Sequence, residues 1–141
     1  MIDSMKKMAG WLLAFSVVGF IAGYVFSDSY GLGLCYSDLQ TNTFDTSCHQ
    51  LFERIGDPML YGFGALAFVF MGLLFVPEAF SRWWKFAVWF VPLAVLLFIF
   101  TPEPQGWVSP IPSPESVFQW VSSFYVIASY SLIGLSLRKK N

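Results

Sequence analysis

Residues 58–101 read PMLYGFGALAFVFMGLLFVPEAFSRWWKFAVWFVPLAVLLFIFT, and this stretch decides the fold. It holds two apolar segments, 58–76 and 83–101, joined by the short connection PEAFSR at 77–82. Each segment has close to the about 20 residues that a helix needs to cross the hydrocarbon core of a bilayer. Because the connection is short, the two helices must be antiparallel neighbours. The stretch therefore predicts a transmembrane helical hairpin.

Two further apolar segments lie on either side of this hairpin, at residues 8–26 and 116–137. The first follows a basic start, as a signal peptide does, but its apolar run exceeds the usual 7–15 residues and no small-residue cleavage site follows. We therefore expect it to be retained as a membrane span. The sequence predicts an all-α integral membrane protein: one domain over residues 1–141, folded as a four-helix transmembrane bundle.

The composition favours the same class of protein. Hydrophobic residues make up 56% of the 141 residues, whereas charged residues make up only 12%. A soluble domain of this size has too little interior to bury so much apolar surface. The formal net charge of -1 also disfavours nucleic-acid binding, which depends on clustered cations that neutralise phosphates. The expected environment is the lipid bilayer.

The basic residues predict the orientation of the chain. Lysine and arginine are enriched on the cytoplasmic side of membrane proteins. Seven of the eight lie before the first span, between the second span and the first turn of the third, or after the fourth: Lys6, Lys7, Arg82, Lys85, Arg138, Lys139 and Lys140. We expect both termini inside and loops 27–57 and 102–115 outside. A bacterial inner membrane with periplasmic loops fits this pattern.

The outer loop 27–57 contains both cysteines, Cys35 and Cys48, and the single histidine, His49. On an oxidising face, two cysteines thirteen positions apart predict a structural disulfide. Catalytic thiol pairs usually have C-x-x-C spacing, and zinc sites follow recurring spacings that this loop does not match, even with Asp45 included. We predict no catalytic residue, no metal and no cofactor.

The two outer loops differ in the structure that we expect. In the first, the residues after Thr46 place Leu51, Phe52 and Ile55 on one face, which predicts a short amphipathic surface helix. The alternative is an irregular loop with a few apolar anchors. Asp57 and Pro58 then read as the N-cap and first residue of the second span. Prolines dominate the second loop and predict an extended strap.

Polar side chains recur along one face of the segment at 116–137. They are Gln119, Ser122, Tyr125, Ser129 and Ser136. The favoured interpretation is a packing seam, because serine allows close helix approach and glutamine bonds across helices. The alternative is a polar path for a solute.

Small residues on the first and second spans also predict close helix packing, within the chain or against a partner. The candidate positions are Gly19, Gly23, Gly62, Gly64 and Gly72.

Ionisable groups inside spans mark transport and proton pathways. Of the four segments, only 83–101 has one, Lys85 near its end. We therefore expect a non-catalytic membrane protein, acting as an accessory, assembly or immunity-type partner of another membrane protein or as a homo-oligomer. A small transporter or channel that uses the polar helix face is the alternative. A membrane thiol–disulfide oxidoreductase is the least favoured hypothesis.

Overall fold

The computed structural model describes residues 2–38, 43–101 and 113–138, and this part of the chain is almost entirely helical. Every helix in it is long and apolar enough to cross a membrane, so the fold is that of an integral membrane protein. The elements in chain order are α1 (Ile2–Ser27), the two-residue strands β1 (Ser37–Asp38) and β2 (Thr43–Phe44), α2 (Thr46–Phe75), the 3-10 turn η1 (Pro77–Ala79), α3 (Phe80–Phe100) and α4 (Pro114–Arg138).

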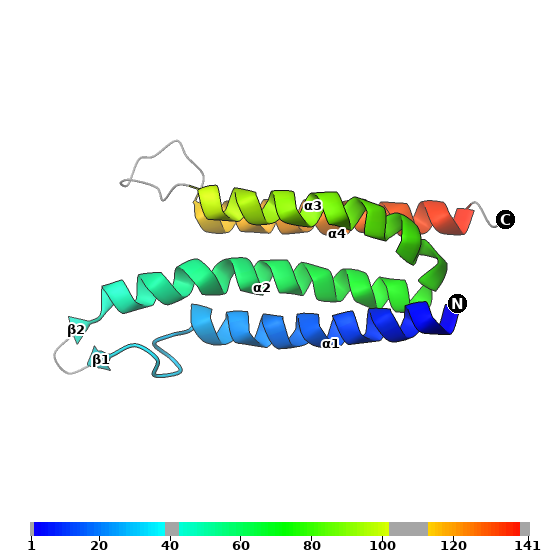
Figure 1. Cartoon of the computed structure of the whole chain (residues 1–141). Coiled ribbons are helices and arrows are strands. Elements are labelled where there is room, and N and C mark those ends of the chain that lie inside the picture. Colours follow the sequence, from blue (N-terminus) through cyan, green and yellow to red (C-terminus); the bar gives the residue numbers. More distant parts are fainter. Residues whose placement is uncertain (1, 39–42, 102–112, 139–141) are drawn as a thin grey trace.

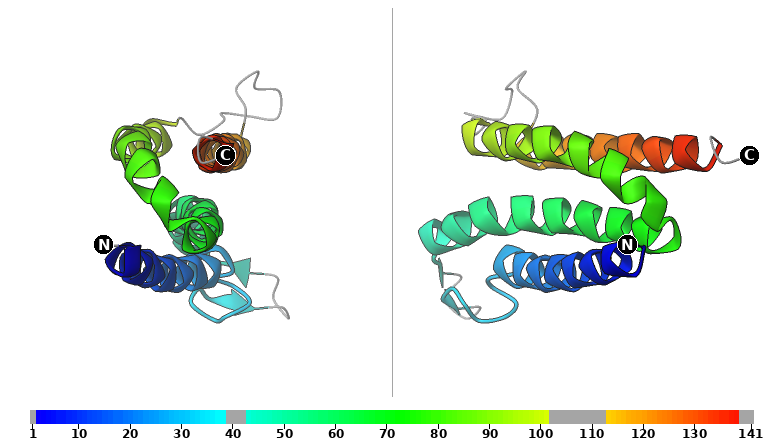
Figure 2. Two further views of the ribbon diagram at one scale, coloured as in Figure 1. Left: turned by 90° about the vertical axis from the view of Figure 1, so that its right-hand side faces the viewer. Right: turned by 45° about the vertical axis from the view of Figure 1, so that its right-hand side comes forward.

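The helices form two layers, with α1 and α2 in one and α3 and α4 in the other (Figure 1). Helix α2 is central, because it packs against α1 along its length and also contacts α4, which in turn contacts α3. The start of α1, the turn η1 and the end of α4 lie at one end of the molecule, and the β1–β2 ladder lies at the other. From η1, helices α2 and α3 diverge toward the ladder end (Figure 2).

Glycines bring the backbones of α1 and α2 into direct contact. A Cβ atom on Gly23 would lie 2.5 Å from the backbone nitrogen of Leu60, and one on Gly56 would lie 2.5 Å from that of Ser27. No other residue type fits these positions without a shift of the helices. This contact also places the Ser27 hydroxyl where it donates a hydrogen bond of 2.8 Å to Asp57.

The buried core lies toward the η1 end, where the helices converge. Trp83, at the start of α3, is 2% exposed and meets the ring of Phe70 edge-on, with ring centroids 5.1 Å apart. Val69 and Leu73 of α2 are fully buried beside it. Tight packing at this end holds α2 and α3 together, whereas their opposite ends lie apart.

The structure does not confirm a separate surface helix in the first outer loop. Residues 46–56 instead form the first turns of α2, which continues through Pro58 without a break. A proline inside a helix normally costs about 3 kcal/mol. Here the tertiary contacts of Gly56 and Asp57 with the end of α1 hold this part of the backbone helical. The expected proline-rich strap lies mostly outside the described residues.

Candidate functional site

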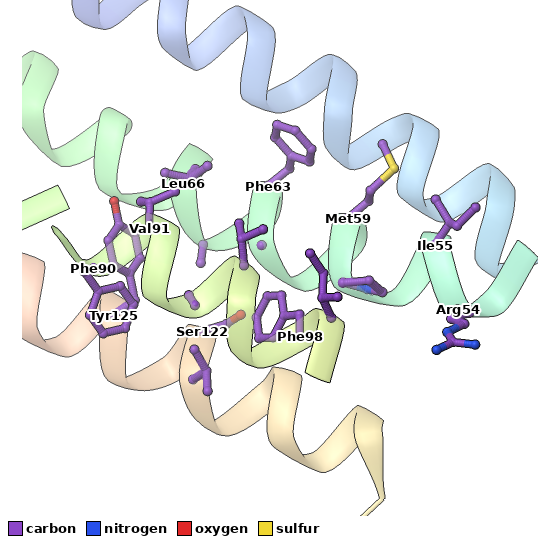
Figure 3. A pocket seen from close by; sticks show the side chains of 17 residues that line it. Arg54, Ile55, Met59, Phe63, Leu66, Phe90, Val91, Phe98, Ser122 and Tyr125 are labelled. Atoms are coloured by element: carbon purple, nitrogen blue, oxygen red, sulfur yellow. The ribbon is translucent and has the colours of Figure 1, made fainter. Parts of the chain in front are cut away.

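The divergence of α2 and α3 leaves an apolar cavity that α4 closes on its third side (Figure 3). Its volume is about 630 Å³, within the range of about 300–1,000 Å³ that is typical of ligand sites. The lining comes from all three helices, including Phe63 and Leu66 of α2, Phe98 of α3 and Tyr125 of α4. The cavity is therefore the main candidate for a binding site.

Small side chains explain why this space is unfilled. Gly62 faces Phe98, but a Cβ on Gly62 would still be 4.0 Å from the nearest ring atom. Ala65 on α2 and Ala94 on α3 also line the cavity. Three short side chains at the place where the helices separate leave a gap that their neighbours do not fill.

The cavity opens sideways between α2 and α3. Among its lining residues, Val95 is 48% exposed and Ile99 is 61% exposed, although both face a helix layer of the same chain. Arg54 lines the end nearest the outer loop and, among the described residues of the lining, is the one that carries a charge. In Figure 3, Arg54 lies at the end of the row of labelled residues, farther from Leu66 than Met59 is.

Two hydroxyl groups of α4, those of Ser122 and Tyr125, lie in the cavity wall. The Ser122 hydroxyl has no hydrogen-bond partner among the described residues, whereas Tyr125 lies next to the polar groups of Trp83 and Ser129. The Ser122 oxygen points into the cavity (Figure 3). An unsatisfied buried polar group costs about 1–3 kcal/mol. These hydroxyls add a small polar element to a mainly apolar wall.

The other members of the polar α4 face have partners outside the cavity. The Gln119 amide donates to the Tyr61 hydroxyl at 3.0 Å and to Glu115 at 3.1 Å. The Tyr61 hydroxyl itself donates to Glu115 at 2.8 Å, which closes a network between α2 and α4. Nearer η1, Ser136 accepts from Arg82 at 3.4 Å. The face thus turns toward neighbouring helices at both ends and toward the cavity in the middle.

Four of the five glycines that we considered for helix packing make contacts inside the chain. Gly19 meets the Phe63 ring, Gly23 the Leu60 backbone, Gly64 the Phe20 ring and Gly72 the Tyr130 ring. The Tyr130 hydroxyl also donates to the Phe68 carbonyl at 2.9 Å, which fixes α4 on α2. Gly62 is different, because it faces the cavity.

The outer loop is cross-linked between Cys35 and Cys48, whose Cα atoms are 5.8 Å apart. Asp45 caps α2 by accepting from the Cys48 amide at 3.0 Å and from the Ser47 hydroxyl at 2.7 Å. These two hydrogen bonds, the amide bond first, lower the pKa of Asp45. The disulfide engages both thiols, and among the described residues no group of three or more metal-binding side chains is present.

His49 has partners that the sequence did not reveal. Its Nδ1 atom is 2.7 Å from the Ser29 hydroxyl, its Nε2 atom is 3.8 Å from Glu53, and its ring stacks on Tyr30. Serine, histidine and a carboxylate also form hydrolase triads. However, Ser29 is 0% exposed, and its carbonyl accepts from the backbone amide of Cys35. This cluster fastens the loop to the start of α2 and offers no access to a substrate.

No protein-family model, curated protein or solved structure matches this chain. The described fold is that of a helical membrane protein with an apolar cavity between α2, α3 and α4.

Proposed function

We propose that the protein is a non-catalytic membrane protein that binds a hydrophobic component of the bilayer in the cavity between α2, α3 and α4. The observation that carries this proposal is the sideways opening of an apolar cavity between two membrane helices. A polar solute would leave its hydrogen-bonding groups against Phe63, Leu66 and Phe98, which disfavours a transport path here.

The biological role that we propose is that of an accessory, assembly or immunity-type partner of another membrane protein. The alternative is that the chain associates with copies of itself as a homo-oligomer. In either role, the protein would bind the molecule in the cavity without changing it chemically. Support comes from the described residues of the lining, of which only Arg54, at the end nearest the outer loop, carries a charge. In the serine–histidine pair of the outer loop, Ser29 is buried, which also favours a structural role for the pair.

The orientation that we propose has both termini in the cytoplasm. Support comes from the basic residues Lys6, Lys7, Arg82, Lys85 and Arg138, all close to the end that carries η1. The disulfide lies at the opposite end, as expected for an oxidising compartment. We place the protein in a bacterial inner membrane with loops 27–57 and 102–115 in the periplasm. Labelling of single cysteines at Ser4 and Ser47 in a background without Cys35 and Cys48 would test this orientation.

The test of binding is mass spectrometry of the full chain released from native membranes under several mild conditions. We expect a hydrophobic molecule or a partner subunit to stay bound. Filling the cavity by Gly62→Leu should remove the small-molecule adduct. A wild-type chain that carries neither adduct nor partner under every condition would contradict the proposal.

A further inference from the structure

We propose that the cavity binds an isoprenoid quinone, one ring carbonyl of which accepts a hydrogen bond from the Ser122 hydroxyl. This inference rests on the proposed function, which requires a hydrophobic occupant from the bilayer. It adds the chemical class of that occupant and the residue that recognises it.

The Ser122 hydroxyl differs from three other serine hydroxyls of the membrane helices. Those of Ser16, Ser131 and Ser136 each donate to the carbonyl four residues earlier in their own helix, at 2.8, 2.8 and 3.0 Å. The Ser122 oxygen is buried, has no hydrogen-bond partner among the described residues and points into the cavity (Figure 3). A buried hydroxyl without a partner carries a free-energy cost that a ligand with a matching polar group would remove. The position of Ser122 therefore indicates where the polar group of the ligand lies.

The depth of Ser122 disfavours a glycerophospholipid as its partner. Glu115 lies at the outer end of α4, where its carboxylate accepts from Tyr61 and Gln119. An ionised carboxylate belongs at the membrane interface. Ser122 follows Glu115 by seven residues, which is about 10 Å at about 1.5 Å per residue, within a leaflet whose hydrocarbon part is about 15 Å deep. The ester carbonyls of a phospholipid stay at the interface, so the partner of Ser122 must be a molecule that carries its polar group inside the hydrocarbon core.

The wall around Ser122 favours a neutral molecule with a carbonyl group. Apart from Ser122 and Tyr125, the described lining residues beyond Arg54 have apolar side chains or none. An ionised group of a ligand, such as the carboxylate of a fatty acid, would be buried there without an opposite charge. A carbonyl needs only the one proton that Ser122 donates. A ligand hydroxyl would bring a second proton, and one of the two protons would stay unpaired.

The other lining residues fit a flat ring with a long tail. Phe90 and Tyr125 stack with their ring centroids 5.2 Å apart and line the cavity together with Phe98 of α3. Aromatic side chains pack well against a further flat ring, either stacked or edge-on. The exposed side chains of Val95 and Ile99 lie where the cavity opens sideways, so a tail can extend there into the bilayer. Isoprenoid quinones are neutral bilayer molecules that combine a flat ring, carbonyl groups and an apolar tail.

The test compares two probes bound by the full chain in nanodiscs. Decylubiquinone is the quinone, and decylbenzene has an aromatic ring and the same tail but no carbonyl. Titrations read by native mass spectrometry should show saturable binding of decylubiquinone. Ser122→Ala should weaken this binding roughly three- to tenfold, the loss expected for one neutral hydrogen bond, and should leave the binding of decylbenzene unchanged. Ser131→Ala is the matched control, because it makes the same change in α4 at an exposed hydroxyl that bonds to Ile127.

The carbonyl stretch of the bound quinone measures the hydrogen bond directly. A hydrogen bond weakens the C=O bond, so infrared spectra should show a lower stretching frequency for decylubiquinone in the cavity than in nanodiscs without protein. Ser122→Ala should remove this shift, whereas Ser131→Ala should keep it. A role of Ser122 in helix packing alone would produce no such shift. Equal affinity of the wild type and Ser122→Ala for decylubiquinone, or an unshifted carbonyl in the wild type, would overturn the assignment of Ser122.

Cavity-filling variants separate failure of this inference from failure of the proposed function. Gly62→Leu and, on the facing helix, Ala94→Leu should each remove both decylubiquinone and the adduct retained from native membranes. Gly134→Leu is the matched control, because it makes the same change in a membrane helix at an exposed position with nothing within 4 Å. Circular dichroism would establish that each variant is folded. If decylubiquinone does not bind, or still binds to both variants, while the native adduct is lost from them, only the quinone assignment is wrong. If both folded variants keep the native adduct, the cavity is not the binding site and both proposals fail.

Discussion

Gly62 and Phe98 face each other across the space between α2 and α3, and a Cβ on Gly62 would still lie 4.0 Å from the Phe98 ring. On the other side of α2, a Cβ on Gly23 of α1 would lie only 2.5 Å from the Leu60 backbone. Glycine thus has opposite roles on the two sides of one helix. It allows contact between α1 and α2, and it leaves room between α2 and α3.

The α1–α2 contact predicts a large difference between two Gly→Ala variants. Gly23→Ala should destabilise the protein by about 1–3 kcal/mol, because the new methyl group overpacks a backbone contact. Gly10→Ala, also in α1 but with nothing within 4 Å, should be neutral or stabilising by up to about 1 kcal/mol through helix propensity. Unfolding in mixed detergent micelles measures both. Equal stabilities would contradict the close approach of the two helices.

The disulfide predicts a stability that depends on redox conditions. Cys35→Ser should lower the free energy of unfolding by about 3 kcal/mol, the value expected for a closed loop of this length. Cys48→Ser and the double variant should match it, because either change opens the same cross-link. Thermal unfolding with and without a reductant provides the measurement. A wild-type protein that is insensitive to the reductant under unfolding conditions would argue against the cross-link.

The Ser29–His49 hydrogen bond predicts that a buried hydroxyl stabilises the outer loop. Ser29→Ala should cost about 1–2 kcal/mol, because it removes the 2.7 Å partner of the His49 ring. Ser131→Ala is a suitable control, since that hydroxyl is exposed and only bonds back to its own helix at Ile127. If the two variants lose the same free energy of unfolding, the Ser29–His49 hydrogen bond contributes no more to stability than an exposed hydrogen bond within a helix.

The cap of α2 predicts a pH-dependent helix start. The pKa of Asp45 is lowered from 3.8 by the Cys48 amide and the Ser47 hydroxyl, so the ionised carboxylate is favoured in the folded state. Its stabilisation is fully present above pH 3.8 and is lost as the pH falls through the lowered pKa. The protection of the Cys48 amide from hydrogen exchange, measured relative to the intrinsic exchange rate at the same pH, should therefore decrease in acid. Asp45→Asn keeps a capping oxygen but cannot ionise, so its cap should lack this pH dependence.

Local features of the sequence were sufficient to predict the four apolar helices, because span length and hydropathy are properties of consecutive residues. The start of α2 was not predictable in the same way. Asp57 and Pro58 resemble a helix start, but α2 continues through them, and Gly56 and Asp57 contact the end of α1 there. A sequence pattern does not contain that long-range contact.

The cavity depends on the same kind of long-range information. Gly62 and Gly72 are equivalent small residues in one apolar segment, yet Gly72 meets Tyr130 whereas Gly62 borders an open space. The difference arises from the angle at which α2 and α3 leave η1. Likewise, His49 finds Ser29 twenty residues away, in a turn that has no recognisable motif.

Photocrosslinking with a bilayer-soluble alkyl probe that carries a reactive group in its chain tests the occupied cavity most directly. After digestion, mass spectrometry locates the modified residues. We predict that crosslinks concentrate on Phe63, Leu66 and Phe98, and that Gly62→Leu removes them while Gly134→Leu does not. Crosslinks spread evenly over the exposed positions Phe75, Trp89 and Phe100, with none enriched in the cavity, would contradict the account.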